Sequence, residues 1–407
     1  MTFETALTGL NAASTKLGAI SNNIANNATT GFKRSRAEFS DVFAKSTLGY
    51  SAVAVGQGVR NSAIKQEFTQ GNVSFTNNNF DIAISGEGMF RMTDGNDAYY
   101  TRAGTFGLDP DGFIVNNQGS RLSGYSTDSD NMIVPIADDL QLDFSELPPK
   151  ATEEVEITLN LSSEAEVLAP FDVTDPSSVN FSTSASVYDS LGTPQVSTVY
   201  FHKDTPNSWS AYTYVDDVEV SQPGGDEIIF TDAGEIATIN GAPGNEISTS
   251  VFNPVSGGAP MSVDINFGGT TQFDNPFGVN RISQDGYAAG RLNNFDIDEA
   301  GVIFGRFTNS QAKIMGQVTL TKFANTQGLQ QIGNSSWSES YSSGEPVIGV
   351  PKGGSFGNLQ SGALESSNVD ITQELVSMIG AQRSFQANAQ VISTADTLTQ
   401  TVINLKR

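Results

Sequence analysis

The sequence contains no cysteine, and this absence excludes disulfides, zinc–thiolate sites and cysteine nucleophiles. Histidine is nearly absent as well, because His202 is the only one among 407 residues. It ends a predicted strand, where we expect a surface role. Basic residues are few, since 21 Lys+Arg stand against 45 Asp+Glu and give a formal net charge of −24. We therefore expect no nucleic acid and no anionic membrane as partners, because both repel such a surface.

Long apolar runs are missing too. No stretch of about 18 apolar residues occurs, so we expect no membrane span. Residues 1–5 lack the basic start and apolar run of a cleaved signal peptide, so any export must retain the N-terminus. Phosphate-loop and dinucleotide fingerprints are absent, and we predict no catalytic residue, no cofactor and no metal. A carboxylate pair that forms only in three dimensions stays open as an alternative.

The first 27 residues carry a heptad pattern. Apolar residues recur every seven positions, and each of the first three is followed three positions later by another: Phe3, Leu10, Leu17 and Ile24, then Ala6, Ala13 and Ile20. This a/d spacing is typical of a coiled coil. It predicts a helix over 1–27 that ends at Asn26 and Asn27.

The C-terminal end repeats the pattern. Apolar residues there are separated mostly by four or three positions: Ile371, Leu375, Met378, Phe385, Ile392, Leu398 and Val402. Gln382 is a polar residue within this pattern, and the pattern shifts by one residue at Val391. These spacings predict a helix over 370–407, about 50 Å long. Most amphipathic helices pack on their own domain, but the intervening chain has almost no helical periodicity. We call the row of apolar residues along each predicted helix its seam. We therefore expect the two seams to pair with each other and with other copies of the chain, forming the polymerisation interface.

The middle of the chain alternates apolar and polar residues, as expected for strands, over 80–85, 155–161 and 263–267. Residues 106–114 match 295–303 in the spacing of phenylalanine, aspartate and glycine, with a looser echo at 229–236. Each segment predicts a hairpin whose tight turn uses Asp and Gly. A calcium loop at Asp109 and Asp111, or at Asp298 and Glu299, is the alternative, but it lacks the distal bidentate glutamate.

Composition marks the boundaries of a mainly β fold with α-helical termini. We expect the terminal helices to pair as a coiled coil, and a β-rich inner domain to be assembled from both sides of an inserted, acidic outer β domain. The expected segments are 1–27 (helix), 28–70 (extended linker), 71–144 (inner domain, first part), 145–284 (outer domain), 285–337 (inner domain, second part), 338–369 (Ser/Gly/Pro-rich linker) and 370–407 (helix).

Motifs at both ends resemble a known family. Residues 22–34 resemble the signature of the bacterial flagellar rod, hook and hook-associated proteins, through Asn26, Gly31, Phe32, Lys33 and Arg34. Residues 361–389 resemble the closing helix of that family, including Gln382, Arg383 and Asn388. Residues 81–90 and 100–106 are similar to its inner β domain. The length of 407 residues and the acidic β insert resemble the hook subunits more than the shorter rod proteins.

This resemblance implies a structural subunit of a flexible helical tube, which couples motor torque to the filament and lets export substrates pass. Terminal helices would line the core, with Arg102, Gly104 and residues 32–34 in structural or interface roles. The implied partners are copies of the chain, the distal rod, the hook cap, the hook–filament junction proteins and the flagellar type III export apparatus. The implied location is the extracellular flagellum, reached without a cleaved signal peptide. A distal rod protein and a secreted β-rich adhesin are the alternatives.

Overall fold

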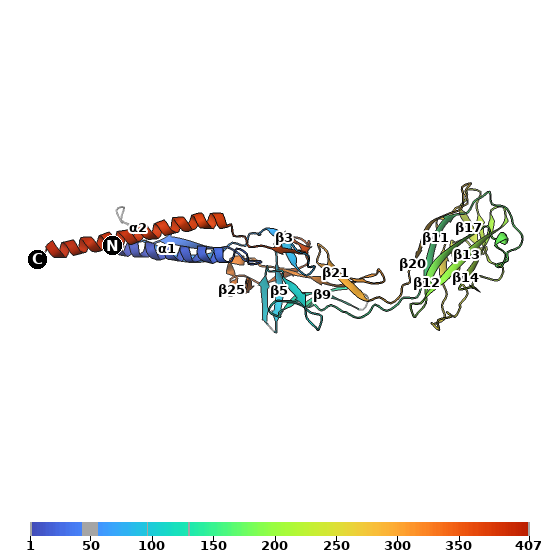
Figure 1. Cartoon of the computed structure of the whole chain (residues 1–407), viewed down its shortest axis with the longest axis horizontal. Coiled ribbons are helices and arrows are strands. Elements are labelled where there is room, and N and C mark those ends of the chain that lie inside the picture. The colour runs from blue at the N-terminus through green and yellow to red at the C-terminus, as the bar shows by residue number, and fades with distance from the viewer. Residues whose placement is uncertain (1, 43–55, 96, 129–130, 406–407) are drawn as a thin grey trace. The chain divides into compact units, whose positions relative to one another are not determined.

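The computed structural model describes residues 2–42, 56–95, 97–128 and 131–405. Two helices stand at the ends of the chain, α1 (Thr2–Ala25) and α2 (Ile371–Leu405), and strands fill the middle (Figure 1). The fold is thus mainly β with helical termini, as predicted. The chain forms two compact units: unit 1 holds Met1–Phe144, Asn294–Arg306 and Ala312–Arg407, and unit 2 holds Ser145–Asn293 and Phe307–Gln311. The inner unit is therefore assembled from both sides of an insert.

Unit 1 is built around a sheet whose main path runs β21-β22-β23-β9-β5-β6-β26-β25. The bounds along this path are Leu292–Ile297 (β21), Val302–Phe307 (β22), Ala312–Val318 (β23), Arg121–Thr127 (β9), Met89–Asp94 (β5), Asp97–Thr101 (β6), Ser336–Ser338 (β26) and Gln330–Gly333 (β25). Branching from it are Phe106–Leu108 (β7), Ile114–Asn116 (β8), Ile133–Asp139 (β10), Leu320–Lys322 (β24) and Val347–Gly349 (β27). A short 3-10 turn, η2, spans Thr326–Gly328.

Three two-stranded pairs complete unit 1 near the helices. They are β1 (Ser35–Asp41) with β2 (Val59–Gln66), β4 (Ile82–Ser85) with β28 (Asn358–Ser361), and β3 (Val73–Phe75) with β29 (Ala363–Glu365). All three pairs are antiparallel, and the last two join the N-terminal third of the chain to its C-terminal end.

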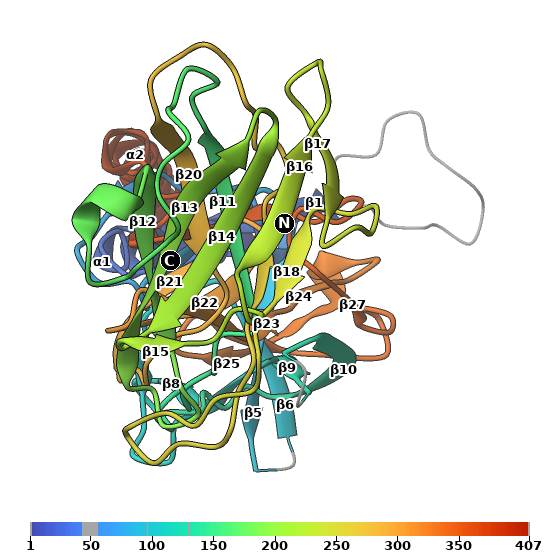
Figure 2. The same cartoon turned by 90° about the vertical axis from the view of Figure 1, so that its right-hand side faces the viewer.

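Unit 2 is a β-sandwich (Figure 2). One sheet runs β12-β13-β14-β16-β17, with bounds Phe181–Tyr188, Pro194–Thr205, Ser208–Val215, Asp226–Phe230 and Ile236–Ile239, and β15 (Val218–Glu219) pairs with β14. The other runs β18-β19-β11-β20, with bounds Glu246–Ser248, Asp264–Asn266, Glu154–Asn160 and Gly278–Gln284. Alternate residues of β11, such as Val155 and Ile157, point into a shared core with Phe201 and Trp209 of the facing sheet. A 3-10 turn, η1, spans Pro176–Ser178.

The predicted hairpins are present as β7–β8, β16–β17 and β21–β22. In the first, Asp109 Oδ1 accepts hydrogen bonds from the backbone N–H groups of Asp111 (3.0 Å) and Phe113 (2.7 Å). In the third, Asp298 Oδ1 accepts from the Val302 N–H at 2.8 Å. These carboxylates therefore act as turn acceptors, and no cluster of three His, Asp or Glu side chains suited to a metal occurs within the described residues.

Several segments differ from their expected form. Residues 28–70 were expected as a linker, yet they contain the β1–β2 hairpin; residues 338–369 were expected as a linker, yet they contain β27, β28 and β29. β28 and β29 pair with the distant strands β4 and β3, and β1 and β2 have no buried residue, so none of them shows a clear apolar alternation in the sequence. Unit 2 runs to residue 293 instead of 284, because bridges at Leu147–Gly290 and Lys150–Tyr287 continue its pairing.

The helix bounds and His202 also need correction. The helices span Thr2–Ala25 and Ile371–Leu405, so residues 26, 27 and 370 lie outside them, whereas the predicted helical residues 1, 406 and 407 lie outside the described residues. His202 is buried, and its Nδ1 lies 2.9 Å from the Ser178 carbonyl oxygen, so the expected surface role is wrong. It lies on the face of β13 opposite to the core residue Phe201, where Ser178 of the η1 turn lies against it. No helix within the described ranges is long and apolar enough to span a membrane.

Candidate assembly interface

The terminal helices pair antiparallel in unit 1. Asn23 lies beside Glu374 at one end of the pair, with Nδ2 3.4 Å from Glu374 Oε2. Further along, a Cβ built on Gly9 would lie 2.8 Å from Asn388 Oδ1, so glycine permits a close approach of the two helices. α1 has 24 residues and α2 has 35, so α2 continues past the start of α1 (Figure 1).

The predicted seam is divided between two surfaces. On α1 the seam residues Ala6, Ala13 and Ile20 are buried. α1 packs there against α2 and the neighbouring strands. The other half is more open, since Phe3 is 50% exposed and Leu10, Leu17 and Ile24 are half-buried. Small side chains allow the helices to approach closely, and the larger residues are left at the margin.

On α2 even fewer of the seam residues are buried. Among residues 371–404, only Glu374 and Ala381 are buried, and Met378 and Ile392 are half-buried. The other predicted residues remain exposed: Ile371, Leu375, Phe385, Leu398 and Val402. Further large apolar side chains that the sequence pattern did not single out are exposed as well: Leu7 on α1, and Val376, Ile379, Val391 and Ile403 on α2. One copy of the chain therefore covers only part of the apolar surface of its helices.

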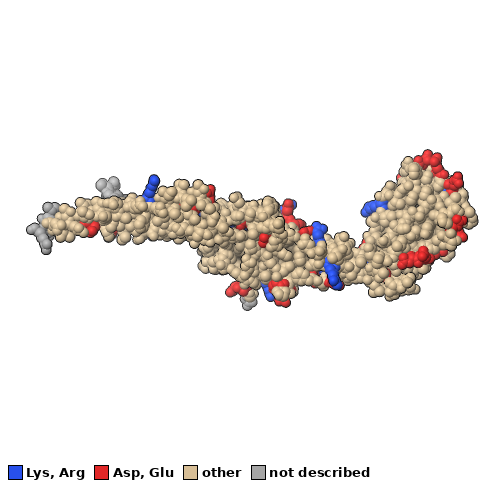
Figure 3. Space-filling model, viewed as in Figure 1, with Lys and Arg blue, Asp and Glu red and all other residues tan. Residues whose placement is uncertain are grey.

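Charge is sparse on these helices. Glu4 and Lys16 are the charged residues of α1, and Glu374, Arg383 and Asp396 are those of α2. Figure 3 accordingly shows few coloured atoms along the helix pair on the face it draws. A surface of exposed apolar and uncharged polar side chains is suited to contact with another copy, because little charge must be desolvated.

A buried ion cluster joins the start of the chain, the sheet and the segment before α2. Lys33 Nζ lies 2.7 Å from Glu365 Oε1, and Arg102 Nη1 lies 3.1 Å from Glu365 Oε2. The Gly71 N–H also donates to Glu365 Oε1 at 2.8 Å, and Lys33 Nζ donates to the Thr69 carbonyl at 2.8 Å. Both oxygens of the carboxylate are thus satisfied, as a buried charge requires.

The pKa of Lys33 reflects this site. Burial lowers the pKa of Lys33 below its usual value, and the nearby charge of Arg102 adds to that lowering. The charge of Glu365 and its hydrogen bond oppose the lowering. The ammonium therefore depends on Glu365 for its stability inside the unit.

A second set of contacts attaches the helix pair to the strands. The Asn23 side chain donates to the Ser35 carbonyl and accepts from the Ser35 N–H, both at 2.9 Å. Arg34 Nη1 lies 3.5 Å from Glu374 Oε1, and the Arg34 N–H donates to Asn368 Oδ1 at 2.7 Å. We call the ion cluster and these contacts the junction, defined by Asn23, Lys33, Arg34, Arg102, Glu365, Asn368 and Glu374.

Gly31 begins the chain turn that enters the junction. Its φ is +68°, and a Cβ there would lie 2.5 Å from the Ala103 nitrogen. The Gly31 N–H donates to the Glu365 carbonyl at 2.9 Å. Only glycine meets both the left-handed backbone and the close approach.

The remaining residues of the two family motifs fall into a buried or hydrogen-bonded group and an exposed group. Phe32 and Lys33 are buried beside Gly31, and Asn26 donates to the Asn22 carbonyl at 2.9 Å in the last turn of α1. Asn388 lies within the helix pair, whereas Gln382 and Arg383 are exposed and apart from the junction. Sequence periodicity missed Asn23, Glu365, Asn368 and Glu374, because their partners are distant in sequence.

Family comparisons match most of the chain. Four descriptions apply: Flagella basal body rod protein (3–33), Flagellar hook protein FlgE/F/G D1 domain (83–160), Flagellar basal body protein FlaE D2 domain (158–287) and Flagellar basal body rod FlgEFG protein C-terminal (360–405). The order of these matches follows the architecture described above.

Full-length relatives and one solved structure agree. The flagellar hook protein FlgE of Escherichia coli strain K12 is 38% identical over 420 residues, covering 100% of each chain. That of Salmonella typhimurium strain LT2 is 37% identical over 421 residues, again covering 100% of each. The crystal structure of the Helicobacter pylori flagellar hook protein FlgE2 shares the fold, with a TM-score of 0.53 and 14% identity over 72% of this chain and 100% of that chain. The chain therefore belongs to the flagellar hook protein FlgE family, whose members are structural proteins and not enzymes.

Proposed function

We propose that this chain builds the flagellar hook by polymerising through the apolar surfaces that α1 and α2 leave exposed. The single observation that carries the proposal is the division of the seam: small residues close the helix pair, and large ones such as Leu375 and Ile379 are exposed. Full burial of such a side chain contributes about 1.5–3 kcal/mol, so a copy that covers several of them is held firmly.

The junction supports this proposal by fixing the helix pair to the inner unit. Asn23 and Arg34 bind the start of the strands to α1 and to Glu374 of α2, and the ion cluster locks the segment before α2 onto the sheet. Force applied to one part of unit 1 is thereby carried to the helices through buried contacts. Such coupling suits a subunit that transmits torque along a tube.

The subunit surface determines the form of the polymer. A contact between two different patches of the same protein generates an open helical filament when its rotation does not close a ring. The exposed faces of α1 and α2 differ in sequence and in length, which favours such head-to-tail contacts. Polar and acidic β surfaces outside a helical core make modest contacts, which permits bending without rupture.

The same proposal includes the proteins that the hook would contact. The tube would begin on the distal rod, grow beneath the hook cap and end at the hook–filament junction proteins, with subunits delivered by the flagellar type III apparatus with the N-terminus retained. Support comes from the position of α1, whose Ala6 and Ala13 are built into the helix pair. Mass spectrometry of secreted subunits tests the last point, since a cleaved N-terminus would contradict it.

Electron microscopy of charge variants tests the polymerisation surface. The double substitution Leu375→Glu and Ile379→Glu places two carboxylates on an exposed face of α2 without touching the junction, so the monomer should fold and tubes should fail to form. The matched control is Val251→Glu with Val255→Glu, at residues of unit 2 that are 72% and 83% exposed. Normal tubes from the α2 variant would contradict the proposal. Straight rigid tubes would favour a distal rod subunit, and ligand binding by a monomer would favour an adhesin.

A further inference from the structure

Within the described residues, the C-terminal end of α2 has no partner helix. Asn23 lies beside Glu374 and Gly9 beside Asn388, so the antiparallel pairing places the first residue of α1 opposite about position 395 of α2. Residues 396–404 therefore extend beyond α1, as Figure 1 also shows. We call this segment the overhang.

The overhang continues the apolar stripe that faces α1 elsewhere along α2. Val402 lies one heptad after Ala395, and Ile403 lies eleven residues after Ile392, so both fall near the same side of the helix as these half-buried residues. Yet Val402 is 64% exposed and Ile403 is 62% exposed. These two apolar side chains therefore lie on the side of α2 that faces α1 elsewhere, at positions that α1 does not reach.

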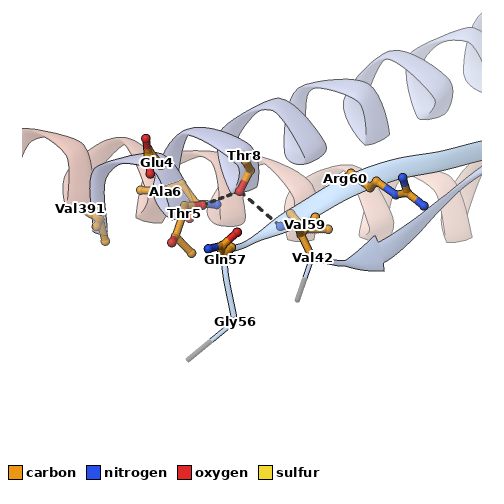
Figure 4. A pocket seen from close by; sticks show the side chains of 11 residues that line it. Glu4, Thr5, Ala6, Thr8, Val42, Gly56, Gln57, Val59, Arg60 and Val391 are labelled. Carbon is orange, nitrogen blue, oxygen red and sulfur yellow. Dashed lines mark hydrogen bonds between the residues drawn. The ribbon is translucent and has the colours of Figure 1, made fainter. Parts of the chain in front are cut away.

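An apolar cleft of about 710 Å³ lies at the same end of the helix pair (Figure 4). Its walls come from α1, from α2 and from the loop end of the β1–β2 hairpin, and they include Ala6, Val42, Val59 and Val391. Thr8 holds the hairpin to the helix: the Val59 N–H donates to Thr8 Oγ1 at 3.3 Å, and the Thr8 hydroxyl donates to the Thr5 carbonyl at 2.8 Å. The cleft is therefore a built feature of unit 1.

We propose that the overhang of one copy docks into this cleft on the next copy. This inference rests on the proposed polymer and names one of its contacts. The chemistry matches, because Val402 and Ile403 would meet the apolar part of the cleft wall, formed by Ala6, Val42, Val59 and Val391 beside polar side chains such as Thr5 and Gln57. Nine helical residues span about 13 Å.

Charge adds a second match. Arg60 and Glu4 are the charged residues that line the cleft, and Asp396 starts the overhang, one heptad before Ile403 and hence on the same side of the helix. Arg60 and Asp396 take part in no ion pair between described residues: Arg60 donates to Ser40 Oγ at 3.2 Å, and Asp396 accepts from the Gln400 amide at 3.1 Å. Docking would bring these opposite charges together at the rim, with the apolar residues inside. Because the overhang and the cleft are different surfaces, the contact is head-to-tail and repeats along the polymer.

Cysteine pairing between two separately made variants tests the contact, since the chain has no cysteine of its own. Val59→Cys and Val402→Cys subunits are mixed, polymerised under salting-out conditions and oxidised. We expect a disulfide-linked dimer that contains one copy of each, because a disulfide needs Cβ atoms about 3.5–4.5 Å apart. The matched control mixes Val59→Cys with Val376→Cys, whose α2 position is 66% exposed but lies outside the overhang, and should give no such dimer.

Amide hydrogen exchange of the unmodified chain is a second test, and it requires no substitution. On polymerisation, amide hydrogen exchange should slow together at residues 57–60 and in the overhang. Tubes that form without the mixed dimer, or without protection at 57–60, overturn the docking contact and leave the polymer proposal intact. If the unmodified chain forms no tubes at all, the proposed function itself fails, which is a distinct result.

Discussion

Removing the charge of Glu365 is the most informative perturbation of unit 1. Glu365→Gln keeps the shape of the side chain but leaves Lys33 and Arg102 as buried cations without a counter-ion. The side chains of Glu365, Lys33 and Arg102 are 0%, 1% and 7% exposed, so water offers little compensation. Breaking one buried ion pair costs about 3–5 kcal/mol, and we expect the free energy of unfolding of unit 1 to fall by at least that amount.

The two tryptophans make the assay specific, because Trp337 lies in unit 1 and Trp209 lies in unit 2. Urea unfolding is followed by fluorescence of the full chain, with Trp209→Phe or Trp337→Phe used to isolate each signal. A multi-domain chain is not expected to unfold in one transition, so each unit has its own midpoint. Glu365→Gln should lower the Trp337 midpoint and leave the Trp209 midpoint unchanged.

The matched control is Glu67→Gln. Glu67 pairs with Arg34 and Arg36 at 3.4 Å each, but its side chain is 30% exposed, so about 1 kcal/mol or less should be lost. Lys33→Met should fall between the two, because Glu365 then retains Arg102 and the Gly71 N–H. If Glu365→Gln destabilises unit 1 no more than Glu67→Gln does, the ion cluster does not hold the junction and the reasoning fails.

Three further predictions follow from single features. Gly31→Ala should destabilise unit 1 by more than about 1 kcal/mol in urea unfolding, whereas Gly18→Ala, in open space on α1, should stabilise it by up to about 1 kcal/mol; equal effects would contradict the strained turn. Burial raises the pKa of Asp226, so its stabilising contribution is complete below the unfolded pKa and is lost as pH rises through the folded pKa. Asp226→Asn should therefore raise the thermal midpoint of unit 2 at neutral pH and make little difference below about pH 4, and a pH-independent effect would refute this. Deleting residues 145–293 of unit 2 should spare export but change hook stiffness or curvature, and unchanged mechanics by electron microscopy and optical trapping would refute the role given to unit 2.

The sequence predicted the features that depend on short-range spacing. Heptads predicted both helices, with the described ends at Ala25 and Ile371 within two residues of the expected ones, and Asp–Gly turns predicted the three hairpins, because such signals are local. Alternation predicted the buried face of β11 correctly, since a sandwich strand has one face inside. The insert within a β-rich inner domain was foreseen from composition.

The junction could not be predicted in the same way. Glu365 meets Lys33 across 332 residues of sequence, and Asn23 meets Glu374 across 351. No periodicity marks such pairs, since they form only when the ends of the chain are brought together. The predicted polymerisation residues remain a proposal, although their exposure on α2 is what an unassembled subunit requires.

The central claim is that the terminal helices are the polymerising elements and the β units are not. Electron microscopy tests it most directly when the purified full chain is compared, under salting-out conditions, with a version lacking residues 1–25 and 371–407. The full chain should form short curved tubes, while the trimmed version should form none and should retain both tryptophan unfolding transitions. A full chain that stays monomeric, or a trimmed version that still forms tubes, would contradict the account.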